Sequence, residues 1–78
     1  MSNFQFNFNK LRGKIKEKYN TQKNFSNAVG IGRTTLSERL NSKSYFTNKE
    51  IVIICNSLDI PFQEIHLYFF NISIQKAE

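Results

Sequence analysis

The sequence is poor in the residues from which catalytic and metal sites are built, with one cysteine and one histidine among 78 residues. A disulfide needs two cysteines, so Cys55 cannot form one within the chain, which fits a reducing compartment and excludes a zinc site made of cysteines. His66 has no second histidine or cysteine at ligand spacing, and the acidic residues show no evident pairing. A glycine-rich phosphate loop is also absent. We therefore expect no catalytic site, and hence no enzyme, and no metal, cofactor or small-molecule ligand.

Long apolar runs are absent as well. No stretch is long enough to cross a membrane, and the N-terminus lacks the charged-then-apolar pattern of a signal peptide. We expect a cytoplasmic protein without membrane contact. A chain of 78 residues is expected to be one domain with a modest buried fraction, so association with another molecule would add to its stability.

Positive charge is concentrated in the first half of the chain. Residues 1–43 hold nine Lys or Arg against two Glu, a balance of +7. Residues 44–78 hold two Lys against four acidic residues, a balance of −2, which gives the net charge of +5. A basic half of this kind is attracted to a polyanion such as the phosphate backbone of nucleic acid.

Residues 21–40 predict two short helices separated by a turn at 30–32. Glycine in this turn can adopt a positive φ, which lets the backbone bend sharply between the helices. Each helix has an apolar face, and the small Ala28 would let the second helix approach closely. The two faces consist of Phe25, Ala28 and Val29 before the turn and of Leu36 and Leu40 after it. This pattern is typical of a helix-turn-helix, with residues 33–40 as the recognition helix.

The order of these residues resembles the helix-turn-helix of the lambda-type phage repressor and Cro family, also called the XRE family. The residues that carry the resemblance are Thr21-Gln22, Phe25, Ala28-Val29-Gly30-Ile31 and Thr35-Leu36-Ser37. It covers residues 8–69 and is closest to the short Cro-like proteins of phages from low-GC Gram-positive bacteria. It implies an all-α, compact five-helix, lambda-repressor-like domain that binds double-stranded operator DNA. The sequence departs from the commonest family pattern, which has Glu and Gly where this chain has Leu40 and Ser42.

The first positions of a recognition helix point into the major groove. The predicted base-reading residues are Arg33, Thr34, Thr35, Ser37 and Glu38. The guanidinium fork of Arg33 can bond guanine O6 and N7 together, although an arginine at a helix start often contacts phosphate instead. Two alternatives stay open: Thr35 could pack inward, and Glu38 could orient Arg33 or Arg39.

Contacts to the DNA backbone are predicted at the start of the first of the two helices and in the loop after the second. The resemblance implies that Gln22 anchors the helix start on the backbone, where free N–H groups also favour phosphate. The predicted phosphate contacts are Thr21, Gln22, Lys23, Asn41, Ser42 and Lys43. The basic residues between 10 and 18 are interpreted mainly as solvated, with Lys16 or Lys18 able to reach a phosphate.

Three further helices are predicted around this motif. One is capped by Asn7 or Asn9 and runs to about Tyr19. Another starts at Thr47, where Glu50 three residues later completes a capping box. The last, opened by Pro61, continues to residue 70. Cys55 is expected in the core.

Both ends of the chain alternate between apolar and polar residues, which predicts short terminal β-strands at residues 3–8 and 70–74. The two strands could pair with each other, the second could pair with its twin in a dimer, or both could be extended tails over the core. The predicted organisation is a single domain over 1–78, with a core at 8–69 and extended segments at 1–7 and 70–78.

The last helix carries more apolar surface than a small monomer readily buries, which predicts a homodimer. The expected interface residues are Tyr68, Phe70, Ile72 and Ile74. Together these features predict a Cro-like phage or prophage repressor that binds operator DNA as a dimer, on the nucleoid in the host cytoplasm. The alternative is a protein-interaction module, such as an antirepressor, inhibitor or antitoxin, that uses the helix-turn-helix as a scaffold.

Overall fold

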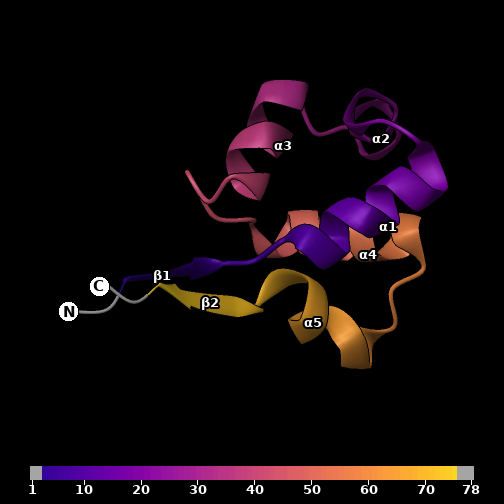
Figure 1. Cartoon of the computed structure of the whole chain (residues 1–78). Helices are drawn as coiled ribbons and strands as arrows, with labels where there is room; N and C mark the ends of the chain where they lie inside the picture. Colours follow the sequence, from indigo (N-terminus) through magenta and orange to yellow (C-terminus); the bar gives the residue numbers. More distant parts are fainter. Residues whose placement is uncertain (1–2, 76–78) are drawn as a thin grey trace.

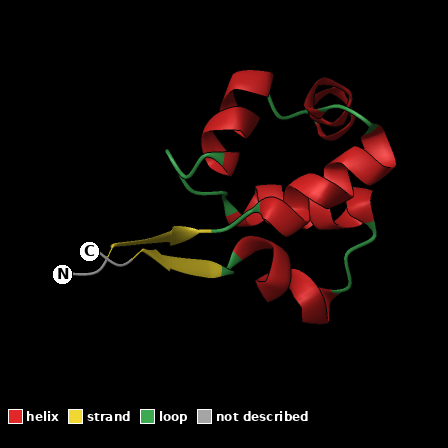
Figure 2. Ribbon diagram, in the orientation of Figure 1, coloured by secondary structure: helices red, strands yellow, loops and turns green. Residues whose placement is uncertain are grey.

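Helices make up most of the chain, and a short two-stranded ribbon joins its two ends (Figures 1 and 2). A computed structural model describes residues 3–75. The elements in chain order are β1 (Asn3–Phe6), α1 (Asn9–Tyr19), α2 (Gln22–Val29), α3 (Arg33–Leu40), α4 (Asn48–Leu58), the 3₁₀ turn η1 (Phe62–Glu64), α5 (Ile65–Phe69) and β2 (Ile72–Gln75). Within the described residues, the prediction of a compact domain of five α-helices is confirmed. None of these helices is both long enough and apolar enough to span a membrane.

Two helices begin at threonine caps, Thr21 before α2 and Thr47 before α4. The Thr21 hydroxyl accepts a hydrogen bond from the backbone N–H of Asn24 at 3.0 Å, which satisfies a free donor at the start of α2. At the start of α4, Thr47 accepts from the Glu50 N–H at 3.1 Å while the Glu50 carboxylate accepts from the Thr47 N–H at 2.9 Å. The predicted capping box is therefore confirmed.

The start of α1 differs in part from its prediction. The Asn7 side chain accepts from the backbone N–H of Asn9 at 2.8 Å, so Asn7 does serve the first turn. Asn9 is itself the first helical residue, and Phe8 occupies the cap position without a capping side chain. Capping by Asn9 was therefore wrong, because a residue already inside the helix cannot supply the cap.

The turn between α2 and α3 depends on Gly30, which has the predicted positive φ of 72°. The small residue beneath the turn, however, is Ser26 and not Ala28. Ser26 is 6 % exposed, and its hydroxyl donates a hydrogen bond to the Ile31 carbonyl oxygen. Ala28 is exposed to solvent, so the prediction that it permits close approach of the second helix was wrong. Positions 26 and 28 lie on opposite flanks of the Phe25 and Val29 stripe, and the choice of the apolar alanine selected the wrong flank.

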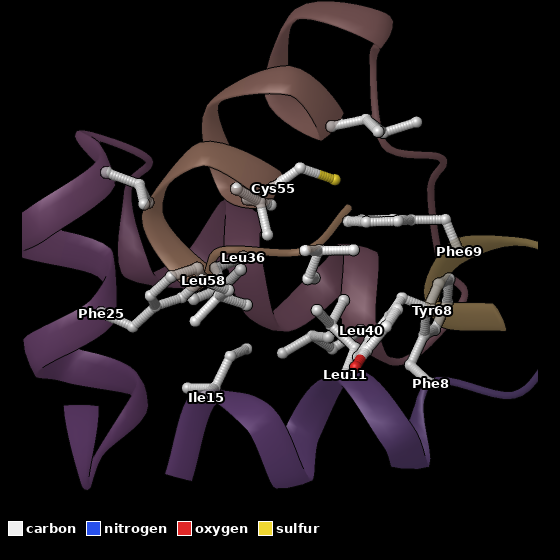
Figure 3. Close-up of a cluster of buried hydrophobic side chains, with 14 of the residues drawn as sticks. Phe8, Leu11, Ile15, Phe25, Leu36, Leu40, Cys55, Leu58, Tyr68 and Phe69 are labelled. Carbon is white, nitrogen blue, oxygen red and sulfur yellow. The ribbon is translucent and has the colours of Figure 1, made fainter. Parts of the chain in front are cut away.

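The core lies where α1, α2, α4 and α5 meet, with α3 packed against α2 (Figure 3). Its fully buried side chains are Leu11, Ile15, Phe25, Leu36, Ile54 and Leu58. The predicted placement of Cys55 in the core is confirmed, and burial raises the pKa of its thiol because the thiolate would lose its hydration.

The last helix is shorter than predicted. The Glu64 N–H bonds to the Pro61 carbonyl oxygen at 2.9 Å, so the segment starts as a 3₁₀ turn and becomes α-helical only at Ile65. A 3₁₀ turn has about three residues per turn instead of about 3.6, which changes the direction in which the later side chains point. Tyr68 and Phe69 consequently face the core.

The two terminal strands pair with each other within the chain. β1 and β2 are antiparallel, with Phe6 opposite Ile72 and Asn3 opposite Gln75. The Asn7 N–H extends the pairing by donating to the Asn71 carbonyl oxygen at 2.6 Å. Of the three arrangements that the sequence left open, the structure has the first, and the ribbon extends from the helical body beside α5 (Figure 2).

Candidate nucleic-acid interface

The α3 helix presents its polar side outward while Leu36 and Leu40 hold its other side in the core. Arg33 and Glu38 are exposed, as is Thr34. Thr35 and Ser37 are half-buried, which agrees in part with the alternative that Thr35 packs inward. Figure 1 shows α3 at the outside of the molecule, on the side away from α5. All five predicted base-reading residues are therefore at least partly accessible on one helix.

A shallow hollow of about 430 Å³ lies between α2 and α3. Lys23 stands on α2 and Arg33 at the start of α3, so two positive charges border the same hollow. Neither side chain has a hydrogen-bond or ion-pair partner among the residues that the structure describes. The lining residues are Lys23, Ser26, Asn27, Gly30, Ile31, Gly32 and Arg33. Unpaired cations at the edge of a depression favour an anionic partner such as phosphate.

A second hollow of about 240 Å³ lies between α1 and the start of α2. Its lining includes Arg12 and Lys16 on α1 and Asn20, Thr21 and Gln22 where α2 begins. The Thr21 hydroxyl is already used as the cap of α2. Lys16 and Gln22 keep their side chains free of intramolecular partners within the described part of the chain, so they remain available to a ligand.

The surroundings of Lys18 differ from those of Lys16, although the sequence analysis gave both lysines the same role. Lys18 forms an ion pair with Asp59, which follows α4. The hydrogen bond between the two raises the pKa of Lys18 and lowers that of Asp59. Phosphate contact by Lys18 would require this pair to break, so Lys16 is the better candidate of the two.

Arg12 holds the C-terminal end of α3, a role that the sequence analysis missed. Its Nη2 donates to the Leu40 carbonyl oxygen at 2.8 Å and to Asn41 Oδ1 at 2.9 Å. The Asn41 amide in turn donates to Ser37 Oγ at 3.3 Å. Arg12 thus satisfies a free carbonyl at a helix end and fixes one predicted phosphate residue. The available signal was that α1 has one arginine among its lysines, and arginine suits such forked hydrogen bonding.

Arg39 connects α3 to the start of α4. Its Nε and Nη2 donate to the two carboxylate oxygens of Glu50 at 3.0 and 3.3 Å, and Nη1 donates to Ser44 Oγ at 2.6 Å. Burial raises the pKa of Glu50, but the hydrogen bonds from Arg39 and from the Thr47 N–H outweigh this and leave the pKa lowered. The idea that Glu38 orients Arg39 was wrong, because Arg39 bonds to Glu50 and Ser44 instead.

The remaining predicted phosphate residues, Ser42 and Lys43, lie in the loop that follows α3. Lys43 is exposed and has no side-chain partner in the described residues. The Lys43 N–H donates to the Glu38 carbonyl oxygen at 2.9 Å, which ties the loop back to α3. The loop therefore holds one accessible positive charge beside an ordered backbone.

The predicted dimer residues do not form one surface. Tyr68 is 6 % exposed and lies in the core, with Lys10 Nζ 5.1 Å from its ring centre, so the prediction that it forms an interface was wrong (Figure 3). Tyr68 was assigned to the interface as part of an apolar surplus on the last helix, but the core of the monomer itself buries this ring. Phe70 and Ile72 are exposed, whereas the side chain of Ile74 lies outside the described residues.

Comparison with known proteins gives a family and a structural neighbour. The family described as "Protein of unknown function (DUF739)" matches residues 4–72. Among solved structures, the solution structure of the modulator of repression (MOR) of the temperate bacteriophage TP901-1 from Lactococcus lactis has a TM-score of 0.75 and 39 % sequence identity. The match covers 86 % of this chain and 90 % of that chain. No curated protein matches.

These matches correct the resemblance to the lambda-type repressor and Cro family. The family that matches nearly the whole chain is DUF739, and a similar solved structure is that of a phage modulator of repression. The assignment to the XRE family was therefore wrong. The residues that suggested it, such as Gly30 and Leu36, are those that any pair of short helices around a sharp turn requires, so they did not identify one family.

Proposed function

We propose that this chain, which belongs to the DUF739 family, is a DNA-binding regulator of phage or prophage transcription that binds operator DNA as a homodimer. In this proposal α2 and α3 form a helix-turn-helix and α3 is the recognition helix. The observation that carries the proposal is the pair of unpartnered cations, Lys23 and Arg33, beside an exposed polar helix. The similarity to a modulator of repression supports a place in a phage repression circuit.

In the proposed complex the start of α3 enters the major groove. Arg33 donates two hydrogen bonds to a guanine, while Thr34 offers a hydroxyl and a methyl group to neighbouring bases. Glu38, one turn later on the exposed side, accepts from a cytosine amino group. Thr35 and Ser37 are half-buried at the edges of the same face, and they contact the DNA from there.

Phosphate contacts on both sides of α3 fix its depth in the groove. Lys23 and Gln22 bind one strand from the start of α2, where free backbone N–H groups also favour phosphate. Lys43 binds from the loop after α3. Arg12 acts as a positioning residue, because it holds the end of α3 and Asn41 by hydrogen bonds at 2.8 and 2.9 Å. Occupancy of a promoter would then exclude RNA polymerase in the host cytoplasm.

The test is a titration of purified protein against the intergenic DNA beside its own gene and against an unrelated duplex, at two salt concentrations. We expect tighter binding to the first duplex, by about a thousandfold or more for a specific regulator. Arg33→Ala should cost about 1–3 kcal/mol in each copy of the dimer and so remove much of this preference. Lys14→Ala is the matched control, because Lys14 is paired with Glu17 and lines neither hollow. Equal, salt-sensitive binding to both duplexes would overturn the proposal.

The second candidate is a protein-interaction module. The similarity to a modulator of repression favours it, because that name describes an effect on repression and not a repressor itself. Such a module would use the fold to contact another regulator. Arg33→Ala and Gln22→Ala would then leave partner binding intact, whereas a change at the exposed Phe70 would weaken it. DNA binding predicts the opposite for the first two variants. Tyr68 is unsuitable for this comparison, since its replacement would disturb the core.

A further inference from the structure

An apolar groove of about 430 Å³ lies between α4 and the η1–α5 segment. Its lining residues are Asn48, Ile51, Val52, Phe62, Ile65, His66 and Phe70. Five of these seven are apolar, and none of them is Asp, Glu, Lys or Arg. Figure 1 shows α1 and α4 between α3 and α5, so the groove belongs to a different side of the molecule from the proposed DNA-binding helix.

The groove is bordered by the most exposed large apolar side chain of the described residues. Phe62 is 84 % exposed, and Val52 and Phe70 beside the groove are 57 % and 52 % exposed. A cluster of exposed apolar side chains on one surface, unlike a single one, indicates an interaction site in a soluble domain. Pro61 precedes Phe62 and fixes the backbone there with a φ of −63°, so the ring is presented from a restrained turn.

We propose that this groove binds a second copy of the chain, with Phe62 of each copy inserted in the groove of the other. Phe62 is both a projecting ring and a wall of the cavity, so one surface supplies the knob and the hole. A surface that is complementary to itself is what a two-fold symmetric dimer requires. The dimer forms in the absence of DNA, so it does not rest on the proposed DNA binding.

The charges beside the groove support the same arrangement. Lys49 lies on α4 next to the lining residue Asn48, and Glu64 lies in η1 between the lining residues Phe62 and Ile65. Neither forms an ion pair within residues 3–75. When η1 of one copy meets α4 of the other, Glu64 faces Lys49, and the symmetry repeats this pair. Opposite charges at the rim of an apolar interface set its register and speed its formation.

The exposed area agrees with a weak dimer. If a whole aromatic side chain has about 200 Å², the 84 % and 52 % exposed fractions of Phe62 and Phe70 correspond to about 270 Å² in each copy. Two copies would hide about 540 Å² from these rings alone, roughly half of the 1,200 Å² at which stable specific interfaces begin. Val52 and the polar rim add further area. A concentration-dependent dimer is therefore expected, one that leaves α3 uncovered.

The experiment is sedimentation velocity on the full chain over a concentration series without DNA. We expect a reversible monomer–dimer equilibrium, and we expect Phe62→Glu to weaken it at least tenfold by placing a charge in each groove. Tyr45→Glu is the matched control, because Tyr45 is also an exposed aromatic, at 76 %, and does not line the groove. Circular dichroism of both variants checks that they remain folded, which is expected for such exposed positions.

Exchanging the charges of Lys49 and Glu64 tests whether η1 of one copy meets α4 of the other. Lys49→Glu and Glu64→Lys should each weaken the dimer, and the double variant should restore it. A chain that stays monomeric up to millimolar concentration, or a dimer that Phe62→Glu leaves unchanged, would overturn the proposal. Failure of the double variant to recover would overturn the pairing of η1 with α4. A monomer that still binds DNA specifically would overturn the dimer alone, and a dimer that binds no DNA would overturn the DNA-binding role alone, so the two outcomes are separable.

Discussion

Ser42 has a backbone conformation that its side chain does not favour. Within residues 3–75, three non-glycine residues have positive φ, and two of them, Asn20 and Asp59, belong to the types that tolerate this region best. Ser42, with a φ of 60°, does not. Its hydroxyl donates to the Phe6 carbonyl oxygen at 3.4 Å, which is long for a hydrogen bond between oxygens and offers little compensation. The loop that holds Lys43 therefore contains a strained residue.

We expect Ser42→Gly to raise the free energy of unfolding by about 0.5–1 kcal/mol, because glycine adopts a positive φ without a steric penalty. Ser42→Ala is the control: it removes the same hydroxyl but keeps the Cβ atom, so it should bring no gain. Urea denaturation followed by circular dichroism measures both. A glycine variant no more stable than the alanine variant would contradict the idea that backbone strain dominates at this position.

At the scale of elements, Glu50 joins two helices. Its carboxylate accepts from the Thr47 N–H at 2.9 Å to cap α4, and it also accepts two hydrogen bonds from Arg39 on α3. The side chains of Arg39 and Glu50 are both 17 % exposed, so the pair is partly shielded from water and salt. One acidic side chain thus fixes the orientation of α3 relative to the helix that follows it.

The lowered pKa of Glu50 gives this link a pH dependence. A carboxylate whose pKa is lower in the folded chain than in the unfolded chain stabilises the fold at pH values above its unfolded pKa, which is about 4.3. This contribution is lost as the pH falls through the pKa of the folded state. Glu50→Gln keeps an acceptor for the cap but loses the charge. We expect it to lower the thermal midpoint at pH 7 and to make little difference near pH 3.

Glu64→Gln, measured at a concentration at which the chain is monomeric, is the control for that comparison, because Glu64 forms no ion pair among the described residues. Thermal unfolding at several pH values, followed by circular dichroism, gives the difference between each variant and the wild type. A deficit of Glu50→Gln that stays constant from pH 7 to pH 3 would mean that the carboxylate charge contributes nothing through Arg39.

For the whole molecule, the fold separates two surfaces of different character. The unpaired cations Lys23 and Arg33 border the hollow between α2 and α3, while the apolar groove lies between α4 and η1–α5. Long-range pairing compensates another positive charge at the surface, since Lys18 is held by Asp59. The charge asymmetry seen along the chain therefore becomes a difference between two sides of one small domain.

This separation predicts which lysines contribute to salt dependence. A phosphate contact adds about 0.9 to the slope of log binding constant against log salt. We expect Lys43→Ala to lower that slope by about 1.8, since the dimer loses one contact in each copy, and to weaken binding to all duplexes alike. Lys14→Ala, which removes a lysine that lines neither hollow, should leave the slope unchanged. DNA titrations at four or five salt concentrations measure both, and equal slopes for the two variants would show that the basic side does not contact phosphate.

Features that depend on near neighbours could be predicted from the amino-acid sequence alone. The caps at Thr21 and Thr47, the turn at Gly30 and the apolar stripes of the helices follow from interactions between residues a few positions apart. Such interactions form in any fold that contains the same segment, so they can be recognised without knowing the rest of the structure. These local features were not sufficient to assign the chain to one repressor family, because a sharp turn between two amphipathic helices is common to several families.

The packing of distant segments determines which polar groups are used within the chain and which remain available. Arg12 bonds to Leu40 across 28 positions, and Lys18 reaches Asp59 across 41. The inward turn of Tyr68 and the pairing of β1 with β2 likewise depend on how distant segments pack. Local periodicity carries no information about a partner so far along the chain. The amino-acid sequence therefore indicated where the candidate surface lies. The tertiary structure decided which side chains on that surface remain free to bind a partner.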